Sequence, residues 1–185
     1  MAEYYLVSQL PSLDGISENS PLPITEERFA ELCNRFLGEK SQQIMKKLTL
    51  SPPKTAESSG SALLDAWNES ERNLRFALGK VRAERLKKPF DTENRIFPVE
   101  DIKAASTAAE MDNPMEAEAY LNRYRLEVLE ALRPMDSFSE DYVFYYGLKL
   151  KLILRIRQFD TKAGEKAYKN IYNSILNGDR LEAKE

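Results

Sequence analysis

The longest uninterrupted helical pattern in the chain covers residues 61–88, and it constrains the fold more than any other feature. At 100° per residue, one face of this predicted helix carries four apolar residues, Trp67, Leu74, Leu78 and Val81. Pro89 follows and ends the helix, because a residue that precedes a proline disfavours helical backbone. Such a face has to be buried along its length, so the fold must supply several partners for it.

Helical patterns also precede and follow this segment. Thr25 is a suitable N-cap for a helix that ends at Gly38 and carries an apolar stripe of Phe29, Leu32, Cys33, Phe36 and Leu37. Further helices are predicted over residues 41–48, 99–111, 114–133 and 139–159. A last helix is predicted from Asp160 to Gly178, with a buried stripe of Ala167, Tyr168, Ile171, Tyr172 and Ile175. Residues 4–7 fit a short strand or a helical turn, so we expect an all-α bundle of about seven helices with little or no β-structure.

The segment at 139–159 is the most apolar in the chain, and part of it is ambiguous. Residues 148–152 alternate leucine with lysine, which is the period of a strand. We predict a helix, because the segment is about twenty residues long, begins at the N-cap Ser139 and is rich in strong helix formers. Tyr145 and Tyr146 then point to different faces of that helix, which leaves one of them available for an interface.

The sequence SPPKTAESSG at residues 51–60 is the best candidate for a domain boundary, because its prolines, serines and glycine interrupt the helical pattern. It predicts an N-terminal helical segment over 1–50, a linker or hinge over 51–60 and a main helical bundle over 61–185. One continuous domain remains open as an alternative.

Composition argues against most enzyme classes. The chain of 185 residues has no histidine and a single cysteine, Cys33, so neither a zinc site nor a histidine-activated nucleophile is expected. The sequence has no GxxxxGK[ST] and no GxGxxG motif to hold a nucleotide phosphate. We therefore predict no catalytic residues, no metal and no cofactor. No apolar run is long enough to cross a bilayer, and the expected location is cytoplasmic.

Arginines form the most distinctive chemical feature of the chain. Residues 72–88 contain seven basic residues and one acid, and the partner-binding candidates among them are Arg72, Arg75, Arg82 and Arg85. Residues 100–140 contain ten acids and four basic residues, so the arginines can pair within the bundle or bind an acidic protein. Nucleic acid is disfavoured, because the formal net charge of the chain is −3.

Five pieces of the sequence carry a resemblance that covers nearly the whole chain: EYYLVSQLPSL, PLPITEERFAELCNRFL, WNESERNLRFALGKVRAERL, NPMEAEAYLNRYRLEVLEAL and DYVFYYGLKLKLILRIRQFD. Together they resemble a small bacterial family encoded within operons for V-type (archaeal-like) rotary ATPases. Their order is also similar to that in the C-type stalk protein of those ATPases, which is named d in eukaryotes. The resemblance implies a helical body like that of the C-type stalk protein, which can be elongated, although this chain is shorter than a typical member of that type.

Two functions from different classes follow. The resemblance implies a non-catalytic coupling subunit, with the central stalk and the membrane rotor ring of the ATPase as partners. Such a protein would lie at the inner membrane only through the complex. The alternative is a free-standing helical adaptor or a nucleic-acid-binding module that uses the basic helix at 72–88.

Overall fold

The computed structural model describes residues 2–16, 21–91, 97–158, 164 and 168–174. Within these ranges it contains no strand, and its seven helices are α1 (Ala2–Ser8), α2 (Glu26–Phe36), α3 (Glu39–Lys46), α4 (Ala62–Arg85), α5 (Val99–Glu110), α6 (Pro114–Ala131) and α7 (Glu140–Gln158). Residues 168–174 are also helical. The predicted all-α bundle is confirmed, and residues 4–7 belong to a helix.

The predicted helix starts are formed by side-chain caps. The Thr25 hydroxyl accepts a hydrogen bond from the Arg28 amide at 3.2 Å, and the Ser61 hydroxyl accepts one from the Leu64 amide at 3.3 Å. Gly38 differs from the prediction. Helix α2 ends at Phe36 with Leu37 as its C-cap, directly before Gly38, but Gly38 has an ordinary φ of −66° and is the N-cap of α3. The turn between these helices therefore needs no left-handed residue.

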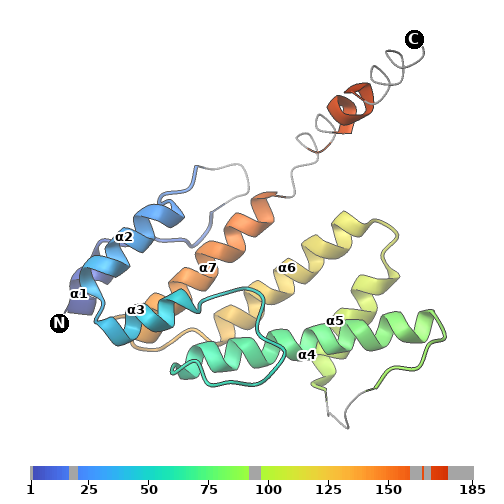
Figure 1. The fold of residues 1–185 in the computed structure, drawn as a ribbon, viewed down its shortest axis with the longest axis horizontal. Helices are drawn as coiled ribbons and strands as arrows, with labels where there is room; N and C mark the ends of the chain where they lie inside the picture. The colour runs from blue at the N-terminus through green and yellow to red at the C-terminus, as the bar shows by residue number, and fades with distance from the viewer. Residues whose placement is uncertain (1, 17–20, 92–96, 159–163, 165–167, 175–185) are drawn as a thin grey trace, which may run out of the picture.

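Helix α7 lies between the N-terminal helices and the α4–α6 helices (Figure 1). Its length and its buried residues confirm a helix at 148–152, where the alternating sequence could also have indicated a strand. Other helices surround this part of α7, so its leucines are buried although they do not all lie on one face. Lys149 is 8 % exposed and lies inside the protein, where carboxylates surround its ammonium group.

Two hydrophobic cores meet on opposite sides of α7. The first joins α1 and α2 to Val143, Tyr146 and Leu150. The second joins α3, α4 and α6 to four other α7 residues, Phe144, Tyr145, Leu148 and Leu152. The adjacent tyrosines therefore do point to different faces, but neither lies at a surface, because each enters a core.

The helices before and after residues 51–60 are joined through α7. The Ser41 hydroxyl of α3 donates a hydrogen bond to Glu140, and the Ser61 hydroxyl at the start of α4 donates one to Asp141 at 2.6 Å. Both carboxylates lie in the first turn of α7, where the positive end of the helix dipole favours them. Helices from both sides of the proposed linker thus share the same anchor.

Gly147 marks the closest approach of helix α7 to its neighbours. A Cβ at this position would lie 3.1 Å from Leu48 Cδ1 and 3.1 Å from Phe29 Cε1. Phe29 belongs to the first core and Leu48 to the second, so the two cores meet at this glycine.

Helices α4, α5 and α6 form a third, smaller core. It contains Leu74 of α4, Ala104 and Ala108 of α5, and Leu121 of α6. The alanines let α5 approach α4 closely, as their small size predicts. Among the described residues, no helix is both long enough and apolar enough to span a membrane.

The predicted buried stripe near the C-terminus is wrong for the residues that the structure describes. Tyr168, Ile171 and Tyr172 are 68 %, 60 % and 52 % exposed, and this helical segment projects away from the bundle (Figure 1). The spacing of these residues makes one apolar face, but burial also needs a second surface, and the cores of the bundle are already closed by α7. Asp160, Ala167, Ile175 and Gly178 lie outside the described residues.

We expect Leu148→Ala to lower the free energy of unfolding by about 2–5 kcal/mol, because it leaves a cavity in the core beside α7. The side chain of Leu148 is fully buried. The matched control is Leu86→Ala, since Leu86 is 66 % exposed, and its expected change is within about 0.5 kcal/mol. Urea denaturation of both variants checks this, and equal losses would contradict the placement of α7.

Candidate functional site

The four candidate arginines do not form one patch, because they divide between the middle and the end of α4. Arg72 is 7 % exposed, and its Nη2 donates a hydrogen bond to Glu69 at 2.9 Å. Arg75 is exposed and donates to Glu71 at 3.2 Å and to the Leu50 carbonyl at 3.2 Å. Arg82 and Arg85 are exposed in the last turn.

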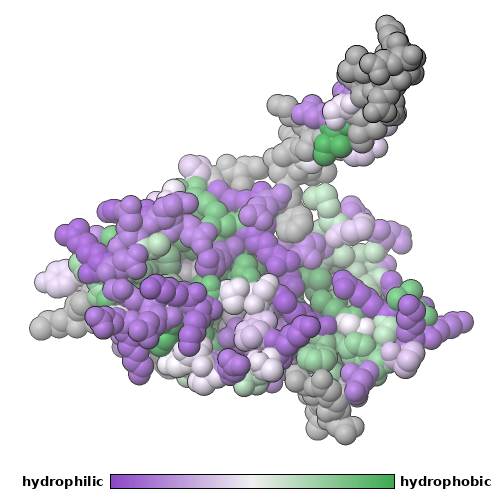
Figure 2. Space-filling view, viewed as in Figure 1, coloured by the Kyte–Doolittle hydropathy of each residue, from purple (hydrophilic) through white to green (hydrophobic). Residues whose placement is uncertain are grey.

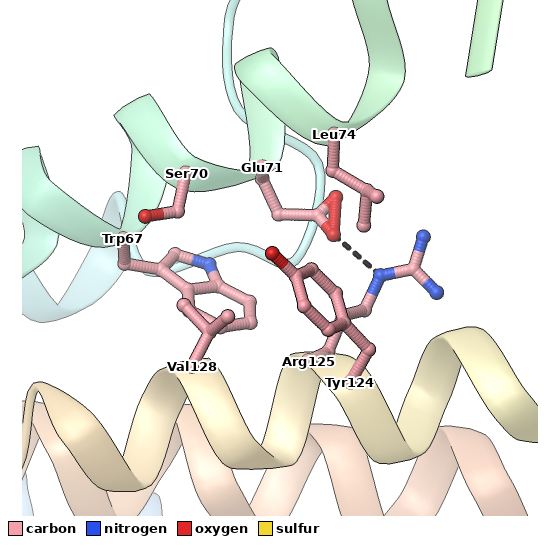
Figure 3. A pocket seen from close by; sticks show the side chains of 7 residues that line it. All are labelled: Trp67, Ser70, Glu71, Leu74, Tyr124, Arg125 and Val128. Carbon is pink, nitrogen blue, oxygen red and sulfur yellow. Dashed lines mark hydrogen bonds and ion pairs between the residues drawn. The ribbon is translucent and has the colours of Figure 1, made fainter. Parts of the chain in front are cut away.

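An ion pair is buried between α4 and α6, and sequence reasoning missed it. Glu71 is 2 % exposed and accepts a hydrogen bond from Arg125 Nε. Figure 3 shows the carboxylate on α4 pointing at this arginine on α6, beside Trp67 and Tyr124. Because both charges are shielded from water, each depends on the other for its stability.

The same network continues from α6 to α7. Arg125 Nη1 donates to Asn122 at 3.1 Å and lies 3.5 Å from Glu118. Arg155 of α7 donates to that second carboxylate at 2.6 Å. Charged groups therefore link three helices, α4, α6 and α7, through one continuous set of hydrogen bonds.

This geometry differs from one of the two alternatives for the arginines of α4, namely that they pair with the acids at 100–140. In the part of the chain that the structure describes, Arg72 and Arg75 pair with acids of their own helix. The contact with α6 has the opposite polarity, since α4 supplies the carboxylate and α6 supplies the guanidinium. Charge totals over long segments could not reveal this, because the pair joins a single carboxylate to a single guanidinium.

Little room for a ligand exists beside the Glu71–Arg125 pair. The cavity in Figure 3 has a volume of about 10 Å³, which is roughly enough for one water molecule. Nearby, Tyr124 donates a 2.7 Å hydrogen bond to Asp101. Burial raises the pKa of the Asp101 carboxyl above its usual value, although this hydrogen bond acts in the other direction.

A second charged cluster surrounds Lys149 of α7. Its ammonium donates to Glu130 of α6 at 2.6 Å and to Asp14 in the N-terminal segment, and Tyr145 donates to the same Glu130 oxygen at 2.6 Å. Burial opposes the charged lysine, but the two carboxylates more than offset it, so the pKa of Lys149 is raised. The hydrogen bond from Lys149 lowers the pKa of Asp14. This cluster ties the N-terminal segment to α6 and α7.

Cys33 has the properties of a packing residue. It is 1 % exposed, and burial raises the pKa of its thiol to about 12, so the thiol stays neutral near pH 7. The predicted buried position in the stripe of α2 is therefore confirmed. Across the residues described here, no group of three or more His, Cys, Asp or Glu side chains is placed to hold a metal ion.

The end of α4 is the most exposed basic surface of this helix. We define the α4 tip as the exposed residues Arg82, Arg85, Leu86, Lys87, Lys88 and Phe90. Lys87 has a φ of +52°, and the amide of Lys88 donates to the Ala83 carbonyl at 2.9 Å, so the chain turns sharply there. Leu86 is 66 % exposed between the cations. The tip thus presents apolar and basic groups together, on a molecule whose visible face is otherwise largely hydrophilic (Figure 2).

The comparisons with known proteins bear on the second half of the chain. A family model described as "Protein of unknown function (DUF2764)" matches residues 87–179, which is half of the chain. The match begins within the α4 tip and continues through α5, α6 and α7. No curated protein and no solved structure matches the chain.

We expect Arg125→Met to lower the free energy of unfolding by about 3–5 kcal/mol, because it leaves the Glu71 carboxylate buried without its partner. Arg123→Met is the matched control, since Arg123 is exposed on the same helix and should tolerate the change. Thermal and urea denaturation at pH 7 give the comparison. A loss no larger than that of the control would contradict the buried pair.

Asp14→Asn tests the Lys149 cluster through pH. The folded pKa of Asp14 is lowered, so its contribution to stability is present above the unfolded value of 3.8 and is lost as the pH falls through the folded pKa. We expect Asp14→Asn to be less stable than the wild type at pH 6 and the difference to shrink below about pH 4. Asp112→Asn, at an exposed loop position, is the control. A pH-independent difference in urea denaturation would contradict the ion pair.

Proposed function

The chain belongs to the DUF2764 family, and we propose that it is a non-catalytic coupling subunit of a V/A-type rotary ATPase. In this role it links the central stalk and the membrane rotor ring, as the C-type stalk protein does. The proposal rests on the resemblance of the sequence to proteins encoded with such ATPases. The observation that carries it on the molecule is the α4 tip, a basic and apolar surface at the end of a helix that is anchored in the bundle.

A coupling subunit has to transmit force without deforming, and the bundle has features that suit this task. Helix α7 is enclosed by two cores, so it cannot move without disturbing both. The Glu71–Arg125 pair and the Lys149 cluster add directional contacts between helices. These features support a stiff body whose function is to hold partners in place.

The α4 tip suits a protein partner that is acidic and helical. Its exposed arginines can donate paired hydrogen bonds to carboxylates, while Leu86 and Phe90 offer apolar contact area. Such an interface associates faster at low salt, because its charges attract the partner over a distance. Stalk and ring subunits with acidic helices would provide this complement.

The alternative of a nucleic-acid-binding module has less support. It would use the basic helix at 72–88, but Arg72 and Arg75 are engaged by Glu69 and Glu71. Arg75 keeps part of its side chain exposed, the cations toward the end of the helix are exposed, and the net charge of the chain is −3. Phosphate binding depends on accumulated free cations, so the tip alone favours a protein.

Recovery of the native complex tests the proposal. We expect the tagged protein, isolated from native membranes in mild detergent, to bring down stalk and ring subunits of the ATPase in amounts visible by mass spectrometry. The double variant Arg82→Glu/Arg85→Glu should lose about tenfold or more of this recovery, because it reverses the charge of the tip.

The control for this experiment is Lys40→Glu/Lys103→Glu, which makes the same change in net charge at exposed sites on α3 and α5. Both double variants should keep the wild-type melting temperature within a few degrees. Absence of ATPase subunits from the wild-type preparation would overturn the proposed function. Equal recovery with both double variants would overturn the assignment of the tip.

A further inference from the structure

A second surface of α4 has the features of a binding groove. The segment between α3 and α4 runs alongside the first half of α4 (Figure 1). Between the two lies a groove of about 700 Å³, which we name the proline groove. Its lining consists of Pro52, Pro53, Lys54, Thr55, Ala56, Arg72, Arg75 and Phe76. A volume of this size is typical of sites that hold a peptide side chain or a small molecule.

Arg72 gives this groove an unusual polar wall. Its side chain is 8 % exposed, and only Nη2 has a hydrogen bond, to Glu69. Within the described ranges, the buried Nε and Nη1 atoms of Arg72 have no hydrogen-bond partner. Buried donors of a charged group are normally satisfied, by water or by another acceptor, and the groove that Arg72 lines is the place from which an acceptor can reach it.

Arg75 lines the same groove one turn further along the helix and is 42 % exposed. Its Nη2 donates to the Leu50 carbonyl and to the Ser51 hydroxyl, both at 3.2 Å, which fixes the guanidinium at the start of the groove segment. The exposed Lys54 adds a third cation on the opposite wall. With Nε and Nη2 of Arg75 engaged in this way, its Nη1 is held in place and remains to donate to an acceptor in the groove.

The local charge balance selects the kind of anion. Glu69 pairs with Arg72, and Glu71 pairs both with Arg75 and with Arg125 of α6. These two carboxylates offset much of the positive charge of the groove. The positive charge that remains in the groove suits a single carboxylate better than a phosphate, because a phosphate carries up to two negative charges near neutral pH.

The other wall of the groove is apolar and rigid. Pro52 and Pro53 have fixed φ angles and no amide hydrogen, so they offer a preformed surface without competing donors. Phe76 lies opposite them on α4 and is half-buried. Together they provide contact area for an apolar side chain next to the bound carboxylate.

We propose that the proline groove binds an acidic peptide segment of a partner protein. An Asp or Glu carboxylate of that segment accepts hydrogen bonds from Arg72 and Arg75, and a neighbouring aromatic or aliphatic side chain packs against Pro52, Pro53 and Phe76. This site adjoins the α4 tip, since the rings of Phe76 and Phe90 lie 6.5 Å apart, but its arginines are different ones and the proposal does not require the ATPase role. An acidic segment of any partner would fulfil it.

Phenylacetate is a suitable probe, because it joins one carboxylate to one aromatic ring. We expect it to shift the Nε–H signals of Arg72 and Arg75 saturably in ¹⁵N-edited NMR spectra of the full chain, with a dissociation constant in the millimolar range. Phenylacetamide has the same shape without the charge, and it should leave both signals in place at the same concentration.

Variants show whether the groove itself is responsible. Arg75→Gln should weaken phenylacetate binding about tenfold or more, as should Arg72→Gln where circular dichroism shows it to be folded. Arg82→Gln, outside the groove, should bind like the wild type.

Three results would overturn the proposal. They are the lack of a saturable shift in the wild type, equal shifts with phenylacetamide, and unchanged binding in a folded Arg75→Gln variant. Tighter binding of inorganic phosphate than of phenylacetate would also overturn it, since the groove would then recognise phosphate groups. Because these measurements use the isolated protein, they do not depend on the outcome of the ATPase recovery.

Discussion

Burial of α7 on all sides is the constraint on which the rest of the structure depends. A helix at the edge of a bundle needs one apolar face, but α7 must satisfy two cores at once, and its successive residues Tyr145 and Tyr146 enter different ones. Full enclosure also places Lys149 inside the protein. Carboxylates from α6 and from the N-terminal segment then have to meet it, so the packing of one helix dictates where charges lie on its neighbours.

Charge in this protein acts mainly between helices and in small numbers. Glu71 and Arg125 are one residue of each sign, yet they connect α4 to α6 in a place that water does not reach. The arginines nearest to this pair are held by acids of their own helix, and those at the end of α4 face solvent. A run of basic residues that looks uniform in the sequence therefore has several different environments.

Much of the fold follows from local sequence patterns, because apolar period, N-caps and prolines act within a few residues. Thr25 and Ser61 begin their helices as predicted, and Cys33 is buried in its stripe. Failures occur where the outcome depends on distant partners. Tyr168 and Tyr172 have the spacing of a buried face but lie exposed, and the partner of Glu71 is 54 residues away along the chain. Pairing at that distance leaves no local trace in a single sequence.

Gly147 makes three positions of the hydrophobic cores depend on one another. Its missing side chain leaves only enough space for Leu48 and Phe29, which approach from opposite cores. A side chain at this position would require Leu48 and Phe29 to shift by a few tenths of an ångström, so its cost depends on how far these two side chains can move. The three positions therefore act as one packing unit, in which a change of volume at one is felt at the other two.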